Sequence, residues 1–468
     1  MSRGALLQLI TKNEIDNYMI DTDIKNSMFQ NVIKKTTNFS EVPYSFYATS
    51  SANWGDTIKF TIKKVGDLLT NMYLVLELPT LSVSNINEAS ASDKDERIST
   101  LRVKWNDYIG NTIIDNVILR IGGQKIDEMT GEYMQFHTEL YDTTWSKLCM
   151  LGHSPNLIYP QTHIDNEYIY IPIKFFFCND LTKALPIIAL EYHEIEIEIK
   201  LRTWEYTYLV LSQVTSQTNN ISSMDEISKV NFAHTSYTIN PILFNNIRLD
   251  CNFIFLDKDE RIAMVNKRHE ILITQTQKLI NACKLTDTIY LNFTNPIKEI
   301  IFALQRKSYY MLGEINNYSG KPKFIPLDNT GNIVTLITDR LWNQIPDFHL
   351  LEQMSIDFNG IERVPTRDYK YWHFVQNYEH YRSRIDHNIY MYSFGLNNKE
   401  NTGSCNFSML DTVRFNVNLS TPETYFYHYS LPEQITVGPD SDTFIKIYAN
   451  NYNIFVAENG MGGIMYTI

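Results

Sequence analysis

The sequence has little of what a metal centre or a redox site requires. Its 468 residues include five cysteines, and none of them forms a CxxC pair with another. Widely spaced thiols, odd in number, offer no closely spaced pair to hold a metal or to run redox chemistry. We expect all five to be reduced, buried thiols. They are Cys149, Cys178, Cys251, Cys283 and Cys405.

Long apolar runs are also missing. Pro172 and Lys174 interrupt even the run at residues 169–177, so nothing approaches the roughly 18 apolar residues of a membrane-spanning helix. The short apolar segment at residues 5–10 is followed at once by polar residues and lacks the core and cleavage site of a signal peptide. We therefore expect a soluble protein that is synthesised in the cytosol.

Positive charge is scarce. Lys and Arg number 41 against 53 Asp and Glu, which gives a formal net charge of -12. Because neutralising a nucleic-acid backbone takes clustered Lys and Arg, we expect no direct contact with nucleic acid. The GxxxxGK[ST] loop, the GxSxG elbow and the DxDxDG calcium loop are all absent. The sequence thus favours a protein that is not an enzyme and has no cofactor, no metal and no catalytic residues.

What the chain does have is aromatic and hydrophobic content. Tyr (30) and Phe (24) are abundant, and aromatic side chains favour strands. Strand-like segments occur in two series of the same order, displaced by roughly 220 to 240 residues, which indicates an internal duplication. The first series is 42–49, 57–63, 72–78, 113–121, 169–177 and 195–199, and the second is 270–276, 288–293, 300–304, 354–358, 389–394 and 413–419.

Local sequence echoes support the duplication. Residues 118–123 and 355–360 both read as a strand that ends in a Gly turn, and a helical segment follows each, at 132–140 and 367–374. The copies also end alike, at residues 251–255 and 452–456.

Residues 257–268 read as a short helix between the copies, with Asp257 as its cap and Glu260 at the capping-box spacing. We place the domain junction there, which gives an N-terminal arm (1–40), a first domain (41–262) and a second domain (263–468). Two polar stretches, 82–96 and 212–228, are predicted to be long loops.

Three glutamates at alternate positions suggest chemistry. Glu194, Glu196 and Glu198 alternate with isoleucines, and residues two apart on a strand lie about 6.5 to 7 Å apart on one face, a separation compatible with an inverting glycosidase. The same alternation is typical of an amphipathic strand with Ile in the core and Glu outside. We favour the structural interpretation.

Histidines and glycines raise two further possibilities. His373, His380 and His387 recur every seven residues, but seven residues of helix rise about 10.5 Å, too far for ligands that each sit about 2 Å from one zinc ion. The pairs His193-Glu194 and His269-Glu270 lack the second His of HExxH. Residues 460–463 (GMGG) resemble a phosphate loop, but too few residues follow for a helix, so we expect a close-packed tail.

Blocks along nearly the whole chain resemble the major capsid proteins of nucleocytoplasmic large DNA viruses, the group that includes irido-, phycodna-, mimi- and marseilleviruses. The blocks are GALLQL (4–9), GDLL (66–69), ID (114–115), IGGQKID (121–127), FFFC (175–178), ALPIIAL (184–190), FLDKDER (255–261), SCNFS (404–408), ANNYN (449–453) and GMGG (460–463). Two departures from the family pattern are Lys63-Lys64, where Pro-Arg is frequent, and Asn111, where His is expected.

The resemblance implies an all-β fold of two consecutive eight-stranded jelly rolls, that is, β-sandwich domains, with short helices in the loops and an N-terminal arm. It further implies a homotrimeric, pseudo-hexagonal capsomer of an icosahedral virion, assembled in the host cytoplasm. Expected partners are neighbouring capsomers, minor capsid and penton proteins and, through the arm at residues 4–24, an internal viral membrane.

Two alternatives remain open. A carbohydrate-binding or carbohydrate-cleaving β-sandwich would explain the aromatic content and the paired glutamates. A penton, minor capsid or scaffold protein would keep the fold and change the role.

Overall fold

The structure is a computed structural model. It describes residues 11, 37–48, 52–85, 101–141, 145–213, 227–229, 237–239, 244, 246–307, 310, 313–320, 325–326, 349–397, 400–420 and 443–466. The chain divides into two units, Met1–Phe39 and Ser40–Ile468, and the strands below belong to the second unit apart from Phe39. Nearly all of the predicted arm, and most of the stretches 82–96 and 212–228, lie outside the described residues.

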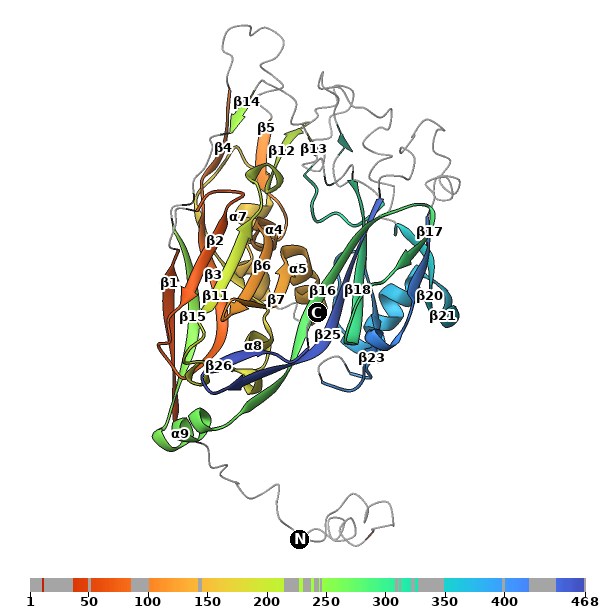
Figure 1. Cartoon of the computed structure of the whole chain (residues 1–468). Coiled ribbons are helices and arrows are strands. Elements are labelled where there is room, and N and C mark those ends of the chain that lie inside the picture. The colour runs from red at the N-terminus through yellow and green to blue at the C-terminus, as the bar shows by residue number, and fades with distance from the viewer. Residues whose placement is uncertain are drawn as a thin grey trace, which may run out of the picture. The chain divides into compact units, whose positions relative to one another are not determined.

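The first set of strands forms a sandwich of two antiparallel sheets (Figure 1). One sheet has the order β1 (Phe39–Tyr47), β15 (Ile247–Leu256), β3 (Leu68–Leu78) and β9 (Glu167–Pro172), and the short β10 (Leu185–Pro186) also pairs with β3. The other has the order β2 (Thr57–Ile62), β11 (Ile195–Leu201), β6 (Ile114–Ile121) and β7 (Gln124–Thr130).

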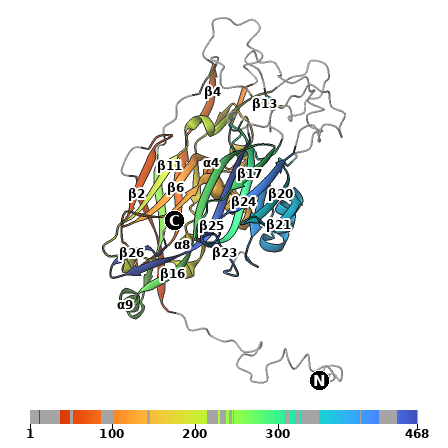
Figure 2. The ribbon, with the colours of Figure 1, turned by 45° about the vertical axis from the view of Figure 1, so that its right-hand side comes forward.

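The second set repeats this arrangement. One sheet has the order β16 (His269–Cys283), β25 (Thr443–Glu458), β18 (Pro296–Arg306) and β22 (Ile389–Ser393), with β23 (Cys405–Asn406) on β18 and β26 (Met461–Ile464) on β25. The other has the order β17 (Thr286–Tyr290), β24 (Val413–Leu419), β20 (Leu351–Phe358) and β21 (Ile361–Asp368). Figure 2 shows β16 and β25 side by side along their length.

Each sandwich therefore has jelly-roll topology. Numbered in chain order, its main strands run one-eight-three-six in one sheet and two-seven-four-five in the other. The predicted duplication is confirmed strand by strand. The turns after β6 and β20 are also equivalent, since Gly122 (φ 58°) and Gly123 (φ 80°) match Asn359 (φ 50°) and Gly360 (φ 82°). Two consecutive positive φ angles define the tight hairpin turn that suits twisted strands.

Apolar alternation explains why these segments form sandwiches. On β11, Ile195, Ile197 and Ile199 are fully buried while the residues between them face outward. On β24, Val413, Phe415 and Val417 are buried in the same way. Because side chains alternate across a strand, each strand delivers one apolar face to a core.

Short strands and helices decorate the sandwiches. Two further sheets have the orders β14-β4-β8 and β19-β13-β12-β5, from β4 (Leu81–Asn85), β5 (Leu101–Trp105), β8 (His163–Ile164), β12 (Tyr208–Gln213), β13 (Ile227–Lys229), β14 (Tyr237–Ile239) and β19 (Ile325–Pro326). The helices among the described residues are α4 (Ile109–Ile113), α5 (Gly131–Tyr141), α6 (Trp145–Met150), α7 (Pro155–Ile158), α8 (Phe176–Asn179), α9 (Lys258–Asn266), η1 (Leu181–Lys183), η2 (Ile187–Ala189), η3 (Trp204–Tyr206), η4 (Tyr371–Val375), η5 (Asn377–Tyr381) and η6 (Phe407–Met409). In the described part, no helix is both long and apolar enough to cross a membrane.

Several predicted boundaries need correction. The strand predicted at 169–177 ends at Pro172, and Phe176–Asn179 is helical. Ile173 and Phe175–Phe177 are all buried. The sequence therefore has no alternation of apolar and polar residues that would mark the end of the strand. The helix predicted at 367–374 begins later, because β21 continues to Asp368. The ends of the predicted loops 82–96 and 212–228 that are described form strands β4, β12 and β13.

The predicted linker helix is present as α9. The Asp257 carboxylate accepts a hydrogen bond from the backbone N–H of Lys258 (2.7 Å). Glu260 Oε2 is buried without a hydrogen-bond partner, so this oxygen does not complete the predicted capping box.

Candidate functional site between the two sandwiches

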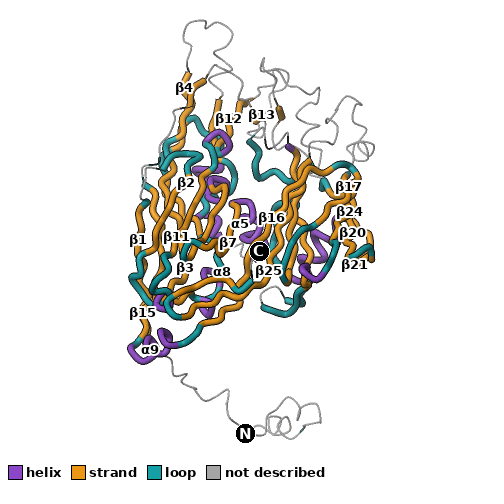
Figure 3. Tube along the Cα trace, viewed as in Figure 1, coloured by secondary structure: helices purple, strands orange, loops and turns teal. Residues whose placement is uncertain are grey.

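Helix α5 is the element that joins the two sandwiches. It begins where the hydroxyl of Thr130 accepts a hydrogen bond from the backbone N–H of Tyr133 (3.2 Å). Met134, Phe136 and Leu140 are buried in one hydrophobic cluster that includes residues of both sandwiches, and Phe136 makes edge-to-face contacts with Tyr318 and Tyr448 of the second. Figure 3 shows α5 between the two sets of strands, close to β7 and β16. The helix is therefore buried on both sides.

A buried ion pair anchors the start of α5. Glu132 accepts a hydrogen bond from Lys446 of β25 (2.7 Å) and another from the Tyr448 hydroxyl (3.2 Å), and the Arg202 guanidinium lies 3.8 Å away. Burial opposes ionisation of Glu132, but Lys446 and Arg202 hold the pKa of the carboxyl below its usual value. Lys446 also lies over the Tyr310 ring (5.4 Å). A buried charge that is bound by several partners fixes both the orientation of the helix and its separation from the strand that carries them.

A second buried carboxylate anchors the end of α5. Glu299 of β18 is 1% exposed. It accepts hydrogen bonds from Asn450 (2.6 Å), from Tyr141 of α5 (2.6 Å) and from Tyr381 of η5. Burial, and then the neighbouring Glu299, raise the pKa of the Tyr141 hydroxyl well above its usual value, so it stays protonated and donates.

A third carboxylate holds the loop before β22. Glu139 accepts from the His387 ring (2.6 Å) and from the backbone N–H groups of Asp386 (3.2 Å) and His387 (3.3 Å). Burial opposes ionisation, but His387 and these hydrogen bonds hold the pKa of Glu139 below its usual value.

The edge strands β7 and β16 of the two sandwiches also contact each other, through hydrogen bonds between side chains and backbone groups. Asp127 of β7 accepts a hydrogen bond from the backbone N–H of Thr276 on β16 (3.2 Å), and Gln275 donates to the carbonyl of Ile126. Burial raises the pKa of Asp127 to about 7. Because an open strand edge invites pairing with other chains, this contact covers two edges at once.

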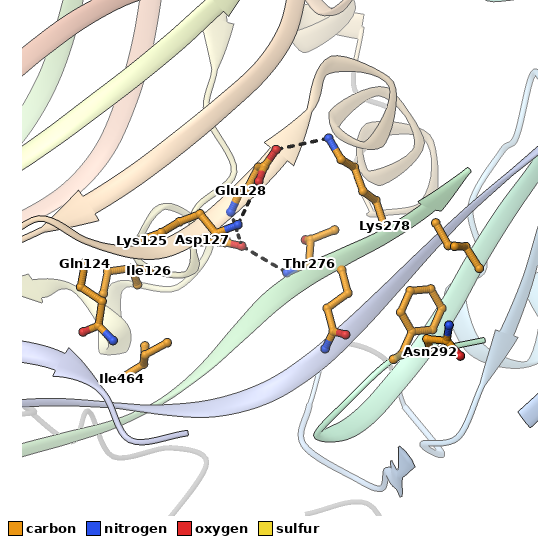
Figure 4. A pocket seen from close by; sticks show the side chains of 12 residues that line it. Gln124, Lys125, Ile126, Asp127, Glu128, Thr276, Lys278, Asn292 and Ile464 are labelled. Carbon is orange, nitrogen blue, oxygen red and sulfur yellow. Dashed lines mark hydrogen bonds and ion pairs between the residues drawn. The ribbon is translucent and has the colours of Figure 1, made fainter. Parts of the chain in front are cut away.

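Two cavities flank this edge contact, and Asp127 and Thr276 line both of them. Their volumes are about 410 and 450 Å³. Figure 4 shows the smaller one, where Glu128 of β7 meets Lys278 of β16 (3.2 Å) and Asp127 points to Thr276. The seam, by which we mean α5 and β7 with their partners on β16, β18 and β25, contains buried carboxylates that accept hydrogen bonds from groups of the second sandwich.

The glutamates singled out in the sequence form no such site. Glu196 and Glu198 point outward from β11, as the structural interpretation predicted, and Glu194 precedes the strand. Glu198 pairs with Lys59 (2.7 Å) and Arg120 (3.3 Å). The hydrogen bond from Lys59 lowers the pKa of Glu198, whereas a general acid at neutral pH requires a raised pKa.

The three spaced histidines have separate partners. His373 contacts the carbonyl of Ile389 (2.6 Å), His387 contacts Glu139, and His380 lies 3.8 Å from Glu379. His269 contacts the carbonyl of Met264 (2.7 Å), and His193 contacts the backbone of Gly462. Among the described residues, no cluster of three or more His, Cys, Asp or Glu side chains could hold a metal ion.

The glycine-rich tail packs closely, as predicted. Gly460 (φ 78°) is in the turn between β25 and β26, and a Cβ on Gly462 would lie 2.4 Å from Leu190. The cysteines are free, as predicted, but only Cys251 and Cys283 are fully buried, whereas Cys149, Cys178 and Cys405 are partly exposed.

Comparison with known proteins adds the decisive observation. Residues 27–257 match the family described as "Major capsid protein N-terminus", and residues 260–463 match "Large eukaryotic DNA virus major capsid protein". The chain belongs to the major capsid proteins of the large eukaryotic DNA viruses. It forms the shell of an icosahedral virion, and the family is structural and not enzymatic.

Relatives of this capsid protein span its whole length. The major capsid protein of Phaeocystis pouchetii virus is 25% identical over 560 aligned positions and that of Paramecium bursaria Chlorella virus 1 is 24% identical over 490, each covering 99% of both chains. The solved structure of PBCV-1 VP54 has a TM-score of 0.70 at 22% identity and covers 94% of this chain and 100% of its own. The Faustovirus major capsid protein has a TM-score of 0.66 at 11% identity, with coverage of 95% and 94%. These structures share the double jelly-roll fold.

Proposed function

We propose that three copies of this capsid protein assemble into a homotrimeric capsomer with a pseudo-hexagonal outline. The observation that carries the proposal is the repeated topology, in which each chain supplies two sandwiches with the same strand order. A closed ring of three identical chains has threefold symmetry. Six similar sandwiches in that ring imitate sixfold symmetry, which is the outline that tiles a flat lattice.

The seam supports this role mechanically. Two sandwiches can imitate neighbouring units of a hexagon only if the angle between them is constant. The buried carboxylates Glu132, Glu139 and Glu299 each bind partners from the opposite sandwich or from the loops beside it. Breaking such a contact leaves a charge buried without a partner, so rotation of one sandwich against the other is costly.

We also propose the remaining assignments that follow from the family resemblance. The domains are an arm at 1–40, a first jelly roll at 41–262 and a second at 263–468, which places the junction in α9. The arm contacts minor capsid proteins and an internal membrane at the inner base of the shell, and neighbouring capsomers and penton proteins contact the rim.

Native mass measurement of the full chain, with negative-stain imaging, tests the trimer. We expect a species of three chain masses and a six-lobed outline. A protein that remains monomeric at micromolar concentration would contradict the proposal. The abundance of the chain in purified virions tests the role, because a minor, penton or scaffold protein would be scarce there and the major shell protein is the dominant band.

A further inference from the structure

The helix that follows the fifth strand is buried in one sandwich and exposed in the other. Thr130 accepts a hydrogen bond from the N–H of Tyr133, three residues on, and Asp368 accepts from the N–H of Tyr371 (3.3 Å) in the same way. The two caps align the helices residue by residue, so that Phe136 corresponds to Phe374 and Leu140 to Tyr378. Phe136 and Leu140 are 0% and 1% exposed, whereas Phe374 and Tyr378 are 54% and 79% exposed.

The inner side of the second helix does not differ in this way. Trp372 and His373 are buried against the second sandwich, as Met134 is in the first. The difference is confined to the outer side, where Phe374, Val375 and Tyr378 form an apolar surface that we call the helix face. Apolar surface of this kind on a single strip is typical of a contact site.

In the first sandwich, the outer side of α5 is covered by the sheet β16-β25-β18-β22. The residues it meets, Lys446, Tyr448, Asn450 and Glu299, point away from the second core. By topology, the counterpart of that sheet in the first sandwich is β1-β15-β3-β9. On the outward side of the counterpart, tyrosines of β1 and β9 are exposed, whereas Val75 and Glu77 of β3 are buried.

This outward side has the composition of an interface. Tyr47, Tyr168 and Tyr170 are 72%, 47% and 38% exposed, and Arg248 pairs with Asp250 (3.1 Å) on β15 between them. Tyr and Arg are enriched in protein interfaces because they bury large areas and still make hydrogen bonds. We call this surface the tyrosine face.

We propose that the helix face of one copy packs on the tyrosine face of the next copy, and so repeats between chains the contact that α5 makes within a chain. The inference rests on the proposed trimer and specifies its interface. In Figure 1, β1 and β21 lie on opposite sides of the α5 contact, so one chain cannot satisfy its own two faces. A contact between two different surfaces closes into a ring when copies are related by rotation. The six sandwiches of the trimer then form a ring in which contacts within a chain alternate with contacts between chains, three of each kind.

The charges are arranged to distinguish the two contacts. Within the chain, α5 brings Glu132 to Lys446. At the position of Glu132, the second helix has the exposed Lys370. On the tyrosine face, the partly exposed Asp250 pairs with Arg248, and Glu77 is buried. Lys370 therefore has the opposite charge to Glu132, so it would be repelled by Lys446 and can approach the Asp250 carboxylate of the tyrosine face. Such reversal favours the correct pairing and penalises the wrong one.

Substitutions on the helix face test the proposal. We expect Phe374→Asp and Tyr378→Asp each to raise the dissociation constant of the trimer by roughly 30-fold or more, the effect of a central interface residue, as measured by analytical ultracentrifugation. The matched control is Leu396→Asp, which changes an apolar residue that is 82% exposed outside the helix face. It should leave the trimer intact. Lys370→Glu provides a milder variant should an aspartate on the helix disturb folding, and circular dichroism monitors the fold.

Cross-linking between copies tests which surface receives the helix. Tyr378→Cys and Tyr170→Cys are prepared separately, mixed as unfolded chains, refolded together and treated with a short bismaleimide. We expect a covalent dimer that forms far more in the mixture than in wild type or in a mixture of Leu396→Cys with Tyr170→Cys. If wild type is trimeric but the helix-face variants stay trimeric and the mixture yields no dimer, the proposed interface is wrong and the trimer stands. If wild type never forms trimers, both proposals fail.

Discussion

The two sandwiches share every main strand and differ in what covers the fifth strand and the helix after it. In the first, β7 and α5 lie under the second sandwich, and nearly every residue of α5 is buried. In the second, β21 has one buried residue, Val364, and the helix exposes Phe374 and Tyr378. The strand topology is thus the same whether or not another sandwich covers the fifth strand and its helix. The residue types on the outer surface of that strand and helix differ between the two sandwiches. Substituting equivalent positions separates the two influences.

The largest difference is expected at the matched phenylalanines. Phe136→Ala removes a fully buried ring and should lower the free energy of unfolding by about 3–5 kcal/mol. Phe374→Ala removes a half-exposed ring and should cost under about 1 kcal/mol in the dissociated chain. Denaturant unfolding followed by fluorescence measures both. Similar losses at the two positions would contradict the burial difference.

The next effect concerns the buried ion pair. Glu132→Gln keeps the shape but leaves Lys446 and Arg202 without a buried counter-charge, so it should cost about 3 kcal/mol. Lys370→Gln, at the equivalent exposed position, should change stability by less than about 0.5 kcal/mol. Because Glu132 joins the sandwiches, we also expect its loss to split one calorimetric transition into two. A single unshifted transition would show that the seam does not couple them.

Acid should affect the second sandwich first. Burial lowers the pKa of His373, and it lowers that of His349 to about 3. Below the ordinary His pKa of about 6.5, these histidines are protonated in the unfolded chain but not in the native state. The free energy of unfolding therefore falls as pH falls from about 6.5 toward 3. His373→Gln, which installs the residue found at Gln135 of α5, should lessen the loss of melting temperature between pH 7 and 5 by a few degrees. An unchanged pH profile would exclude His373 as a contributor.

The smallest effect has the opposite sign and belongs to the first sandwich. Asp127 has a native pKa of about 7 because it is buried, so the native state holds a proton that the unfolded carboxyl releases near pH 4. Its contribution to stability is therefore greatest in acid and declines as pH rises from about 4 to 7. Asp127→Asn keeps an oxygen for the N–H of Thr276 and should flatten this decline in a melting series from pH 5 to 8. A decline that persists in the variant would assign it to other groups.

Sequence periodicity predicted most strands because one face of each is apolar. It missed β7 (QKIDEMT) and β21 (IERVPTRD), the fifth strand of each sandwich. Both are edge strands whose sequences carry almost no apolar alternation: β21 buries Val364 alone, and β7 buries the adjacent Ile126 and Asp127 and then Met129. The eight-stranded count came from the family resemblance.

The seam could not be predicted from the sequence. Lys446 alternates with Ile445 and Ile447, a pattern typical of a strand with one face in solvent. Its burial comes from a helix more than 300 residues earlier, and period-two alternation contains no information about that partner. The local sequence of α5 (GEYMQFHTELY) alternates polar and apolar residues as an exposed helix can, so Glu132 and Glu139 gave no sign of burial.

Strand β25 has a consequence for the order of synthesis. Its inward residues Ile445 and Ile447 complete the second core, and its outward residues Lys446, Tyr448 and Asn450 bind α5. Among the described strands it is the last long one in chain order, and its partner β16 lies well over 150 residues earlier. Such distant pairing is slow to form. We therefore expect a nascent or truncated chain without β25 to leave Glu132 and Tyr133 without these partners, and so to lack the fixed angle between its two sandwiches.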